Sequence, residues 1–347
     1  MTKIKTAVTA PIVKKYLKEM EQYCDIKIGG YAVTGTYMPE DELINFLEGM
    51  EILVIEFEGV TRKVIENSRS LRLIICVRGN PVNVDAEAAA EKGIPVVYTP
   101  GRNANSVAEY IVSSMISVSR HLGRANHEIK NGRYIDKETD DVFEYTGDDD
   151  VLWLMNAEDS PYQEYRGIEI SGRTMGFIGL GAVGIRTVEL LSGFGMQFFA
   201  YDPYCPPDTA DKYHAELLPM NEVFARSEFI AVCCKATPET TGMIGSEQFA
   251  LMRKDSYFIN AARASIVRQK DLVEALEKKK IAGAVLDVFW REPLPENHPL
   301  LKMPNVLITP HIAGASSDVT ACQSRMAAED LGNYARGRPL LRVFKRR

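Results

Sequence analysis

Short apolar runs alternate with helix-compatible stretches along the first hundred residues. Between the apolar runs, stretches such as Asp41–Glu48 and Asp85–Lys92 predict helices, and Gly93 stands where a helix C-terminal glycine belongs. Alternation of this kind predicts a parallel sheet covered by helices on both faces. The predicted strands are Ile4–Thr9, Asp25–Ile28, Glu51–Phe57, Leu71–Val77 and Ile94–Tyr98.

A long helical pattern follows these strands. Asn105 and Ser106 open it, and Ser106 with Glu109 predicts a capping box. Apolar residues recur at helical spacing on one stripe, which predicts a single helix running to about Lys130. The stripe consists of Val107, Ile111, Met115, Val118 and Leu122.

The segment from Arg133 to Arg166 interrupts this regularity because acidic residues dominate it. We interpret 133–166 as an acidic insertion or lid with little regular structure. It encloses one apolar run, Val151–Met155, with Trp153 at its centre. Apolar runs in polar surroundings are usually covered, so we expect a partner subunit or the active-site cleft to cover it, with the subunit interface favoured.

From Arg173 to about Pro310 the alternation of strand and helix resumes. The stretch Asp318–Tyr334 again has helical spacing but no strand partner of its own. We therefore expect it to pack back onto structure formed earlier in the chain.

Composition narrows the class of protein. A length of 347 residues suggests about two domains, and 46% hydrophobic with 25% charged residues is typical of a globular chain. A net charge of −6 argues against a nucleic-acid or membrane-surface partner. No apolar run is long enough for a membrane helix, and the start predicts no signal peptide. Six cysteines without metal-type spacing indicate a reduced, cytoplasmic protein with no metal site.

A glycine-rich turn indicates the cofactor. The apolar run Met175–Ile178 leads into Gly179, Gly181 and Gly184, spaced as G-x-G-x-x-G, and an apolar helix follows. In this fingerprint the glycines permit a tight turn, close approach of a pyrophosphate, and close packing of helix on strand. Asp202 ends the next predicted strand, where its carboxylate would accept hydrogen bonds from ribose hydroxyls and repel a 2′-phosphate. The pattern therefore predicts NAD rather than NADP.

Three ionisable residues each follow a predicted strand: Arg263, Glu292 and His311. The carboxyl ends of the strands line the ligand crevice of an open α/β sheet, so these side chains would meet there. An arginine can bind a carboxylate and polarise a ketone, a histidine can supply a proton, and a glutamate can orient the histidine and favour its charged form. This set suits the reduction of a carbonyl group.

At this point the sequence resembles the D-isomer-specific 2-hydroxyacid dehydrogenase family over nearly its whole length. The resemblance rests on the glycine fingerprint with Asp202 and on four further segments. These are Thr237–Thr240 (Thr-Pro-Glu-Thr), Asn260–Val267, the stretch from Asp287 to Glu292-Pro-Leu-Pro, and Pro310-His311.

The resemblance implies roles for individual residues. Arg263, Glu292 and His311 would form the catalytic triad, and Asp287 would lie near the nicotinamide carboxamide. The loop Arg78, Gly79 and Asn80 would hold the substrate carboxylate with backbone N–H groups. The cofactor-binding residues would be Gly179, Gly181, Ala182, Val183, Gly184, Asp202, Cys233, Thr237, Ala261, Ala262, Asp287 and Gly314.

The resemblance also implies the architecture. A Rossmann NAD-binding domain, 104–316, would be inserted in a discontinuous flavodoxin-like substrate domain, 1–103 and 317–347. Both would be doubly wound parallel-sheet domains. The acidic insert at 133–166 would belong to the NAD-binding domain. The protein would be a homodimer that interconverts a D-2-hydroxy acid and its 2-keto acid with NAD.

Three alternatives stay open at this stage. One is a D-3-phosphoglycerate dehydrogenase without a regulatory domain, since Arg78 and Arg102 would then lie near the substrate loop. The chain ends soon after His311, which leaves no room for the regulatory domain that many such enzymes carry. A second is an NAD(H)-binding corepressor-like interaction protein, although no docking tails flank the domains. A third is a formate dehydrogenase, which pairs its histidine with glutamine, and Glu292 speaks against it.

Overall fold

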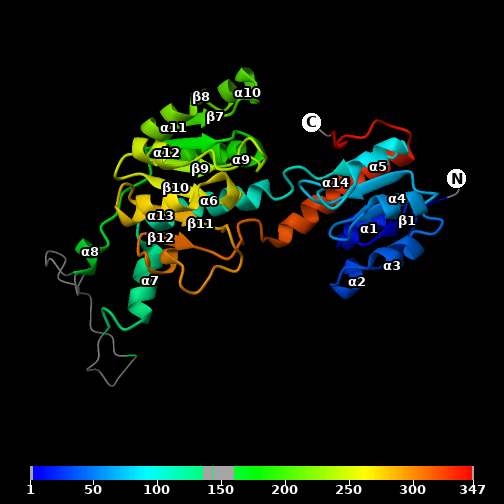
Figure 1. Cartoon of the computed structure of the whole chain (residues 1–347), viewed down its shortest axis with the longest axis horizontal. Helices are drawn as coiled ribbons and strands as arrows, with labels where there is room; N and C mark the ends of the chain where they lie inside the picture. The colour runs from blue at the N-terminus through cyan, green and yellow to red at the C-terminus, as the bar shows by residue number, and fades with distance from the viewer. Residues whose placement is uncertain (1–2, 136–142, 144–159, 346–347) are drawn as a thin grey trace. The chain divides into compact units, whose positions relative to one another are not determined.

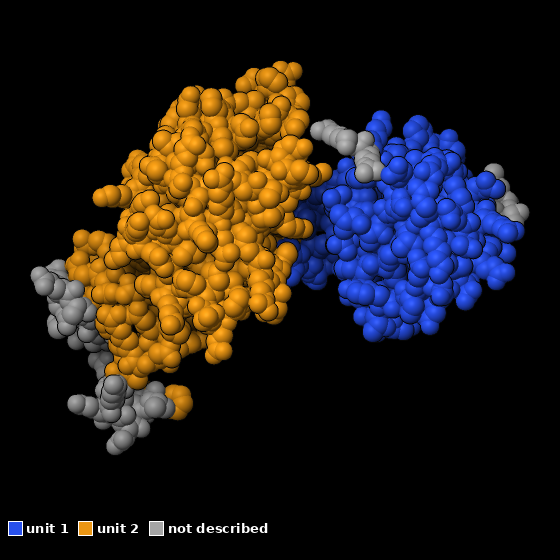
Figure 2. Space-filling model, in the orientation of Figure 1, with its two compact units in different colours: residues 1–104, 314–347 blue, residues 105–313 orange. Residues whose placement is uncertain are grey.

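The computed structural model describes residues 3–135, 143 and 160–345. The chain divides into two compact units, of which unit 1 comprises Met1–Ala104 with Gly314–Arg347 and unit 2 comprises Asn105–Ala313 (Figure 2). Each unit holds one sheet, and every strand pairing in both sheets is parallel. The prediction of two α/β domains with parallel sheets is confirmed.

Unit 1 has a five-stranded sheet in the order β2-β1-β3-β4-β5, with helices on its faces (Figure 1). Every residue of β3 and β4 is buried, as expected for central strands covered on both sides. All five predicted strands form. The elements before the crossing into unit 2 are β1 (Ile4–Val8), α1 (Lys14–Met20), β2 (Cys24–Ile28), α2 (Tyr31–Thr34), α3 (Glu40–Phe46), β3 (Ile52–Ile55), α4 (Arg62–Asn67), β4 (Leu73–Cys76), α5 (Ala86–Glu91) and β5 (Val96–Tyr98).

The returning chain completes unit 1. Helix α14 (Ser317–Ala335) packs against α1, as expected for a helix without a strand of its own, and Ser324 Oγ accepts a 3.0 Å bond from the Val13 amide. The segment after α14 then runs along β5, where the Phe344 amide donates to Val96 O at 2.7 Å. The return of the chain thus covers a sheet face and pairs an edge that would otherwise be exposed.

A buried ion pair ties α14 to the sheet of unit 1. Arg102 Nη1 lies 2.5 Å from Glu56 Oε1 and donates to Val77 O at 2.6 Å. Gln323 of α14 contacts Arg102 and donates to Glu56 Oε2 at 3.1 Å. The Glu56 carboxylate therefore joins the end of β3, the loop after β5 and α14 in one network.

Unit 2 has a seven-stranded sheet in the order β12-β11-β10-β9-β6-β7-β8, again with helices on its faces (Figure 1). The second predicted alternation of strand and helix is confirmed. Its elements are α6 (Ala104–Ser119), α7 (Leu122–Lys130), α8 (Pro161–Glu164), β6 (Thr174–Ile178), α9 (Ala182–Leu191), η1 (Ser192–Phe194), β7 (Gln197–Tyr201), α10 (Pro207–Lys212), β8 (Ala215–Leu217), α11 (Met220–Arg226), β9 (Phe229–Val232), α12 (Ser246–Leu251), β10 (Tyr257–Asn260), η2 (Ala264–Ile266), α13 (Gln269–Glu277), β11 (Gly283–Leu286), η3 (Pro299–Lys302) and β12 (Val306–Ile308).

The prediction of one long helix to Lys130 is wrong, because the chain breaks between α6 and α7. The Ser119 carbonyl accepts a bond from the Ile168 amide at 2.9 Å instead of continuing the helix, and a Cβ on Gly167 would lie 2.0 Å from that carbonyl oxygen. His121 then takes a left-handed backbone conformation with φ of 54°. A distant segment, docked through a glycine, therefore ends α6.

Two further details of this region differ from the prediction. Helix α6 begins at Ala104, so Ser106 lies inside it and cannot cap it, which makes the predicted capping box wrong. Of the predicted stripe, Val107, Ile111 and Met115 are buried in the core, whereas Leu122 is 53% exposed. The apolar face therefore follows α6 and does not continue into α7.

Most of the predicted acidic insert, 133–166, lies outside the described residues, as does the whole of Val151–Met155. At its end Ser160 caps the short α8 by accepting from the Gln163 amide at 3.3 Å. Among the helices of the described ranges, none is both long and apolar enough to cross a membrane.

The buried ion pair of unit 1 predicts a stability effect. Replacing Arg102 by Met leaves the Glu56 carboxylate buried without a cation, and breaking a buried pair on one side costs about 3–5 kcal/mol of unfolding free energy. As a control, Lys63→Met removes an exposed ion pair with Asp41 in the same unit and costs less than about 1 kcal/mol. Chemical denaturation followed by circular dichroism measures both. In the double variant with Glu56→Gln, part of the loss is recovered because the uncompensated charge is gone; equal losses for Arg102→Met and Lys63→Met contradict the assignment.

Candidate active site

The three glycines of the fingerprint have three different structural surroundings. Gly179 has φ of 98°, and a Cβ there would lie 2.7 Å from the Cys234 amide nitrogen. A Cβ on Gly184 would lie 2.9 Å from Gly179 O. At Gly181, by contrast, an added Cβ meets nothing within 4 Å. The first and third glycines are thus required by the chain itself, whereas the second leaves open space above the loop.

That open space lies at the N-terminus of α9. Gly181 is the N-cap residue of this helix, and Ala182 and Val183 form its first turn. Amides in the first turn of a helix have no partners within the helix, and the helix dipole adds partial positive charge there. The loop therefore fits a pyrophosphate that approaches the backbone at Gly181.

Asp202 lies directly after β7 and reaches across to the glycine loop. Its Oδ2 accepts from the Leu180 amide at 2.8 Å, and its Oδ1 accepts from the Tyr204 amide at 2.9 Å. Each carboxylate oxygen keeps a second lone pair, so the group can still accept from sugar hydroxyls. The hydrogen bonds fix the carboxylate beside the glycine loop, and its contact with a ribose stays a prediction.

The other predicted cofactor-side residues follow neighbouring strands of the same sheet. Cys233 follows β9, and burial raises the pKa of its thiol, which therefore stays protonated. The Thr237 amide donates to Thr240 Oγ1 at 2.8 Å within the next turn, while Ala261 and Ala262 follow β10. Gly314 belongs to unit 1, where an added Cβ would lie 2.8 Å from Asn103 Nδ2.

Arg263 is presented by a turn that Asn260 holds. Asn260 is buried at the end of β10, where its Oδ1 accepts from the Ala262 amide at 3.1 Å and its Nδ2 donates to Arg263 O at 3.1 Å. The Arg263 side chain is exposed, and its Nη1 donates to Ala262 O at 2.6 Å. A buried amide thus organises the backbone beneath an exposed guanidinium.

His311 and Glu292 form a hydrogen-bonded pair beside Arg263. His311 Nδ1 lies 2.9 Å from Glu292 Oε2, and the Phe289 amide donates to Glu292 Oε1 at 3.0 Å. The bond to His311 is the main reason why the pKa of Glu292 is lowered, and the charge of Arg263 lowers it further. The lowered pKa keeps Glu292 an acceptor for His311 Nδ1, and this bond leaves Nε2 of His311 as the ring nitrogen available to a ligand.

Asp287 lies fully buried at the end of β11, next to the His311 segment. Its Oδ1 accepts from Thr309 Oγ1 at 2.6 Å and from the Ile312 amide at 2.8 Å, and its Oδ2 accepts from the Ala313 amide at 2.8 Å. The carboxylate thus binds the residues on both sides of His311. Its predicted place near a nicotinamide carboxamide stays a prediction.

Sequence reasoning missed three residues that organise this site: Asn260, Thr309 and Tyr110. Tyr110 of α6 places its hydroxyl 2.6 Å from Thr309 Oγ1. Asn260 opens the segment Asn260–Val267 that the sequence singled out, and Thr309 comes two residues before His311, so both positions were a signal. Tyr110 gave none, because it lies on a distant helix next to the apolar stripe.

The predicted substrate loop belongs to unit 1 and follows β4. Arg78 O accepts from the Thr99 amide at 3.0 Å, which holds the loop against the end of β5, and Gly79 and Asn80 continue it. The Arg78 guanidinium lies over the Phe57 ring, 5.5 Å from its centroid, and forms no ion pair with any described carboxylate. Its charge therefore remains available to a ligand.

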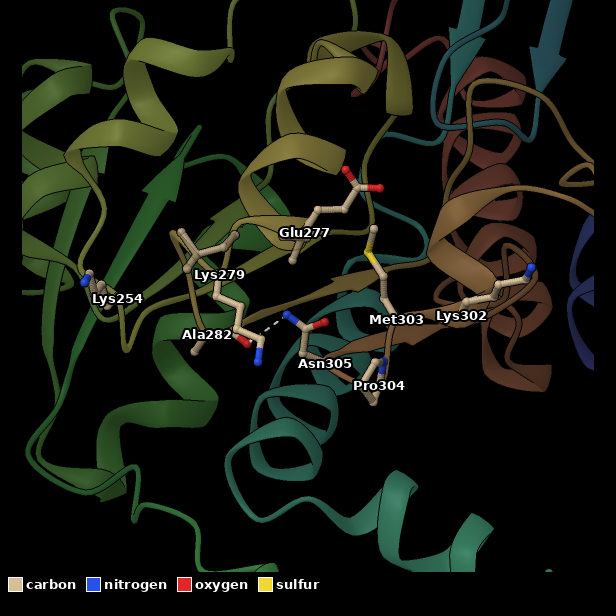
Figure 3. Close-up of a pocket in the computed structure, with 10 residues that line it drawn as sticks. Lys254, Glu277, Lys279, Ala282, Lys302, Met303, Pro304 and Asn305 are labelled. Atoms are coloured by element: carbon tan, nitrogen blue, oxygen red, sulfur yellow. Dashed lines mark hydrogen bonds between the residues drawn. The ribbon is translucent and has the colours of Figure 1, made fainter.

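Within unit 2, a cavity of about 490 Å³ lies at the amino ends of β11 and β12, the sheet edge opposite the one that carries Arg263, Glu292 and His311. Three lysines contribute to its lining, but Lys254 and Lys302 stand on opposite sides of it with their ammonium groups turned apart (Figure 3). It therefore offers no converging set of donors. No group of three or more metal-ligating side chains gathers anywhere in the described parts of the chain.

Comparison with known proteins places this arrangement in a family. Residues 112–313 match the family model of the D-isomer specific 2-hydroxyacid dehydrogenase, NAD binding domain. A Bacillus subtilis protein that bears the name of a 2-hydroxyacid dehydrogenase, YoaD, is 37% identical over 90% of this chain and 85% of its own length. The human glyoxylate reductase/hydroxypyruvate reductase is 32% identical over 87% of this chain and 86% of its own length.

The chain is also similar to phosphoglycerate dehydrogenases and to solved structures. The D-3-phosphoglycerate dehydrogenase of Methanocaldococcus jannaschii is 33% identical over 96% of this chain, which spans only 58% of that longer protein. The NAD complex of a D-isomer specific 2-hydroxyacid dehydrogenase from Lactobacillus delbrueckii shares the fold, with a TM-score of 0.76 at 21% identity over 98% of this chain and all of that one. The chain belongs to the D-isomer specific 2-hydroxyacid dehydrogenase family, and its unit 2 carries the NAD binding domain of that family.

Proposed function

We propose that the protein interconverts a D-2-hydroxy acid and its 2-keto acid, with His311 as proton donor in reduction and proton acceptor in oxidation. The observation that carries this proposal is the 2.9 Å bond between His311 Nδ1 and Glu292 Oε2 beside Arg263. A carboxylate on Nδ1 favours the protonated ring and directs Nε2 towards the reacting oxygen. The exposed side chains of His311 and Glu292, 46% and 40% accessible, leave them open to substrate.

Each of the other polar groups has a part in the proposed reaction. Bound NADH supplies the hydride that goes to the carbonyl carbon. Arg263 binds the carboxylate of the keto acid and polarises its ketone, which stabilises the charge that develops on oxygen. His311 then gives its proton to that oxygen, and the products are the 2-hydroxy acid and the oxidised cofactor.

We assign the cofactor and substrate roles to the two units as the sequence predicts. Unit 2 holds NAD with the glycine loop, the N-terminus of α9 and Asp202, and unit 1 is the substrate domain. The backbone N–H groups of the Arg78–Asn80 loop bind the substrate carboxylate. Burial and hydrogen bonding give Asp287 a further part, which is to hold the segment that carries His311.

Of the two arginines that supported the phosphoglycerate alternative, Arg102 is already bound by other residues of unit 1. Arg102 is bound to Glu56, Val77 O and Gln323 inside unit 1, so its charge cannot serve a substrate phosphate. Arg78 remains free of described carboxylates, and one guanidinium can still meet one anionic group on the substrate side chain. The binding of Arg102 inside unit 1 therefore counts against a phosphorylated substrate, for which Arg78 alone remains.

We further propose that the protein is a cytoplasmic homodimer. All six cysteines are free thiols, which suits a reducing compartment. The dimer follows from the family resemblance. In such a dimer, we propose that the partner subunit covers the apolar run Val151–Met155, which lies outside the described residues.

A panel of keto acids tests the function. The protein should oxidise NADH with one or more of pyruvate, glyoxylate, hydroxypyruvate, phosphohydroxypyruvate and sugar-derived keto acids, and in reverse it should use the D- but not the L-hydroxy acid.

His311→Ala should lower kcat by about 10²–10⁴, the range for losing a positioned acid–base group, and leave NADH binding unchanged. His127→Ala on the exposed face of α7 is the control and should keep full activity. Tight NADH binding without turnover of any keto acid would favour the corepressor-like alternative.

Asp202 should set the choice of cofactor. In Asp202→Ser the acceptor for the ribose hydroxyls and the repulsion of a 2′-phosphate are lost together. The ratio of kcat/KM for NADH to that for NADPH should fall about tenfold or more, because a charged hydrogen bond contributes roughly 1.5–3 kcal/mol. Asp208→Ser, on the exposed start of α10, should leave the ratio unchanged. An unchanged ratio in Asp202→Ser, with the variant still folded, rules out this role.

Glu292→Gln should change the pH profile of reduction. The carboxylate favours protonated His311, so its loss makes the ring give up its proton at lower pH. The alkaline limb of the reductase profile should therefore move down by about 0.2–0.7 pH unit, since an exposed ion pair contributes roughly 0.2–1 kcal/mol and one pH unit corresponds to about 1.36 kcal/mol. Glu296→Gln, an exposed residue of the same loop, serves as control. If the limb stays in place or moves up, Glu292 is not the partner of the proton donor.

A further inference from the structure

His311 stands on a strained piece of backbone. Its φ is 57°, in the left-handed region that residues other than glycine rarely occupy. Such a conformation persists only where neighbouring structure holds it. Among the described residues the exposed His311 ring has one hydrogen-bond partner, Glu292, so we look to the backbone on either side for the constraint.

The buried carboxylate of Asp287 supplies that constraint. It binds the Thr309 hydroxyl on one side of His311 and the Ile312 and Ala313 amides on the other. Asp287 is itself fixed, since its amide donates to Asn260 O at 3.0 Å. One carboxylate is therefore hydrogen-bonded to the chain both before and after His311.

The Thr309 hydroxyl has a second partner, Tyr110. The two oxygens lie 2.6 Å apart, and Thr309 has only one hydroxyl proton, which goes to the acceptor-only carboxylate of Asp287. Tyr110 must therefore donate to Thr309. The protons then point one way, from Tyr110 through Thr309 to Asp287.

This chain connects the His311 segment to a rigid element. Helix α6 is 16 residues long, and Val107, Ile111 and Met115 anchor it in the core of unit 2. Burial raises the pKa of Tyr110, so its hydroxyl keeps its proton and remains a donor. Without that donor, the Thr309 hydroxyl can rotate away from Asp287 and release one of the three bonds that hold His311 in place.

We propose that Tyr110 is a positioning residue for His311, acting through Thr309 and Asp287 without touching substrate or cofactor. The proposal rests on the proposed function in one respect, namely that His311 handles the reacting proton. Its physical content, the ordering of the His311 segment by a tyrosine on α6, is independent of any activity.

The first test is Tyr110→Phe, which removes the hydroxyl and keeps the ring. Loss of one neutral hydrogen bond from the chain should lower kcat about three- to tenfold, while KM and the Kd for NADH stay within about twofold. The chain has five histidines, so a ¹³C-labelled His311 ring signal can be assigned by its absence in His311→Ala. That signal should shift or broaden in Tyr110→Phe as the segment samples more than one conformation.

Tyr257→Phe is the matched control. Tyr257 is half-buried in the same sheet, its ring stacks on Phe229 at 5.6 Å, and it begins β10 at the edge away from His311. Its loss of hydroxyl should leave kcat and the His311 signal unchanged. If Tyr110→Phe leaves both unchanged as well, or changes only the melting temperature as Tyr257→Phe does, the proposal fails.

Variants of Thr309 separate the chain from simple packing. Thr309→Ser keeps the hydroxyl and should retain kcat and the His311 signal, whereas Thr309→Val removes it and should lower kcat at least as far as Tyr110→Phe. Because both residues act through one path, the double variant Tyr110→Phe/Thr309→Val should be no worse than Thr309→Val alone. Additive losses overturn the proposal. If no keto acid is turned over, the proposed function fails, and the His311 signal in these variants still decides the positioning role.

Discussion

The arrangement of the proposed active site depends on one buried carboxylate. Asp287 has no exposed surface, yet it determines the position of His311, whose ring is nearly half exposed. An exposed side chain at a left-handed backbone position cannot hold itself in one orientation, because solvent competes for its hydrogen bonds and the backbone favours other conformations. Three donors on one carboxylate, taken from both sides of the histidine, replace that missing constraint. Burial of this polar group is tolerated because three hydrogen bonds from its own chain satisfy it.

The same division between a buried anchor and an exposed reactive group recurs around the sheet edge. Asn260 lies buried between β10 and the turn that presents Arg263, just as Asp287 lies beneath His311. In the glycine loop, the packing needs of the chain are met at Gly179 and Gly184, and this leaves Gly181 facing open space. Parallel strands make this possible, since neighbouring carboxyl ends place an anchor from one strand within reach of the loop of the next.

How far the sequence predicts this structure depends on how local each cause is. The strands, the glycine turn and the three ionisable residues after strands were predicted, because apolar runs and turn glycines act over a few positions. The break between α6 and α7 was not, since the group that ends α6 is the Ile168 amide, far along the chain. The expected substrate contact of Arg102 failed for the same reason. Glu56 and Gln323, which bind Arg102, come from distant segments of the chain. The contact of Tyr110 with the site could not be predicted, because its partner, Thr309, lies in another part of the chain.

These long-range contacts share a pattern that bears on how the units are joined. The chain passes between the units twice, after Ala104 and again after Ala313. In unit 1, Glu56 binds both passages, since Arg102 precedes the first and Gln323 follows the second. In unit 2, Tyr110 follows the first passage and bonds to Thr309, which precedes the second. Each unit therefore ties the two passages to each other through a buried carboxylate network, with Glu56 in one and Asp287 in the other. The segment that carries His311 is thus fixed on the unit 2 side before the chain leaves that unit, so the geometry of the proposed proton donor is set within unit 2 itself.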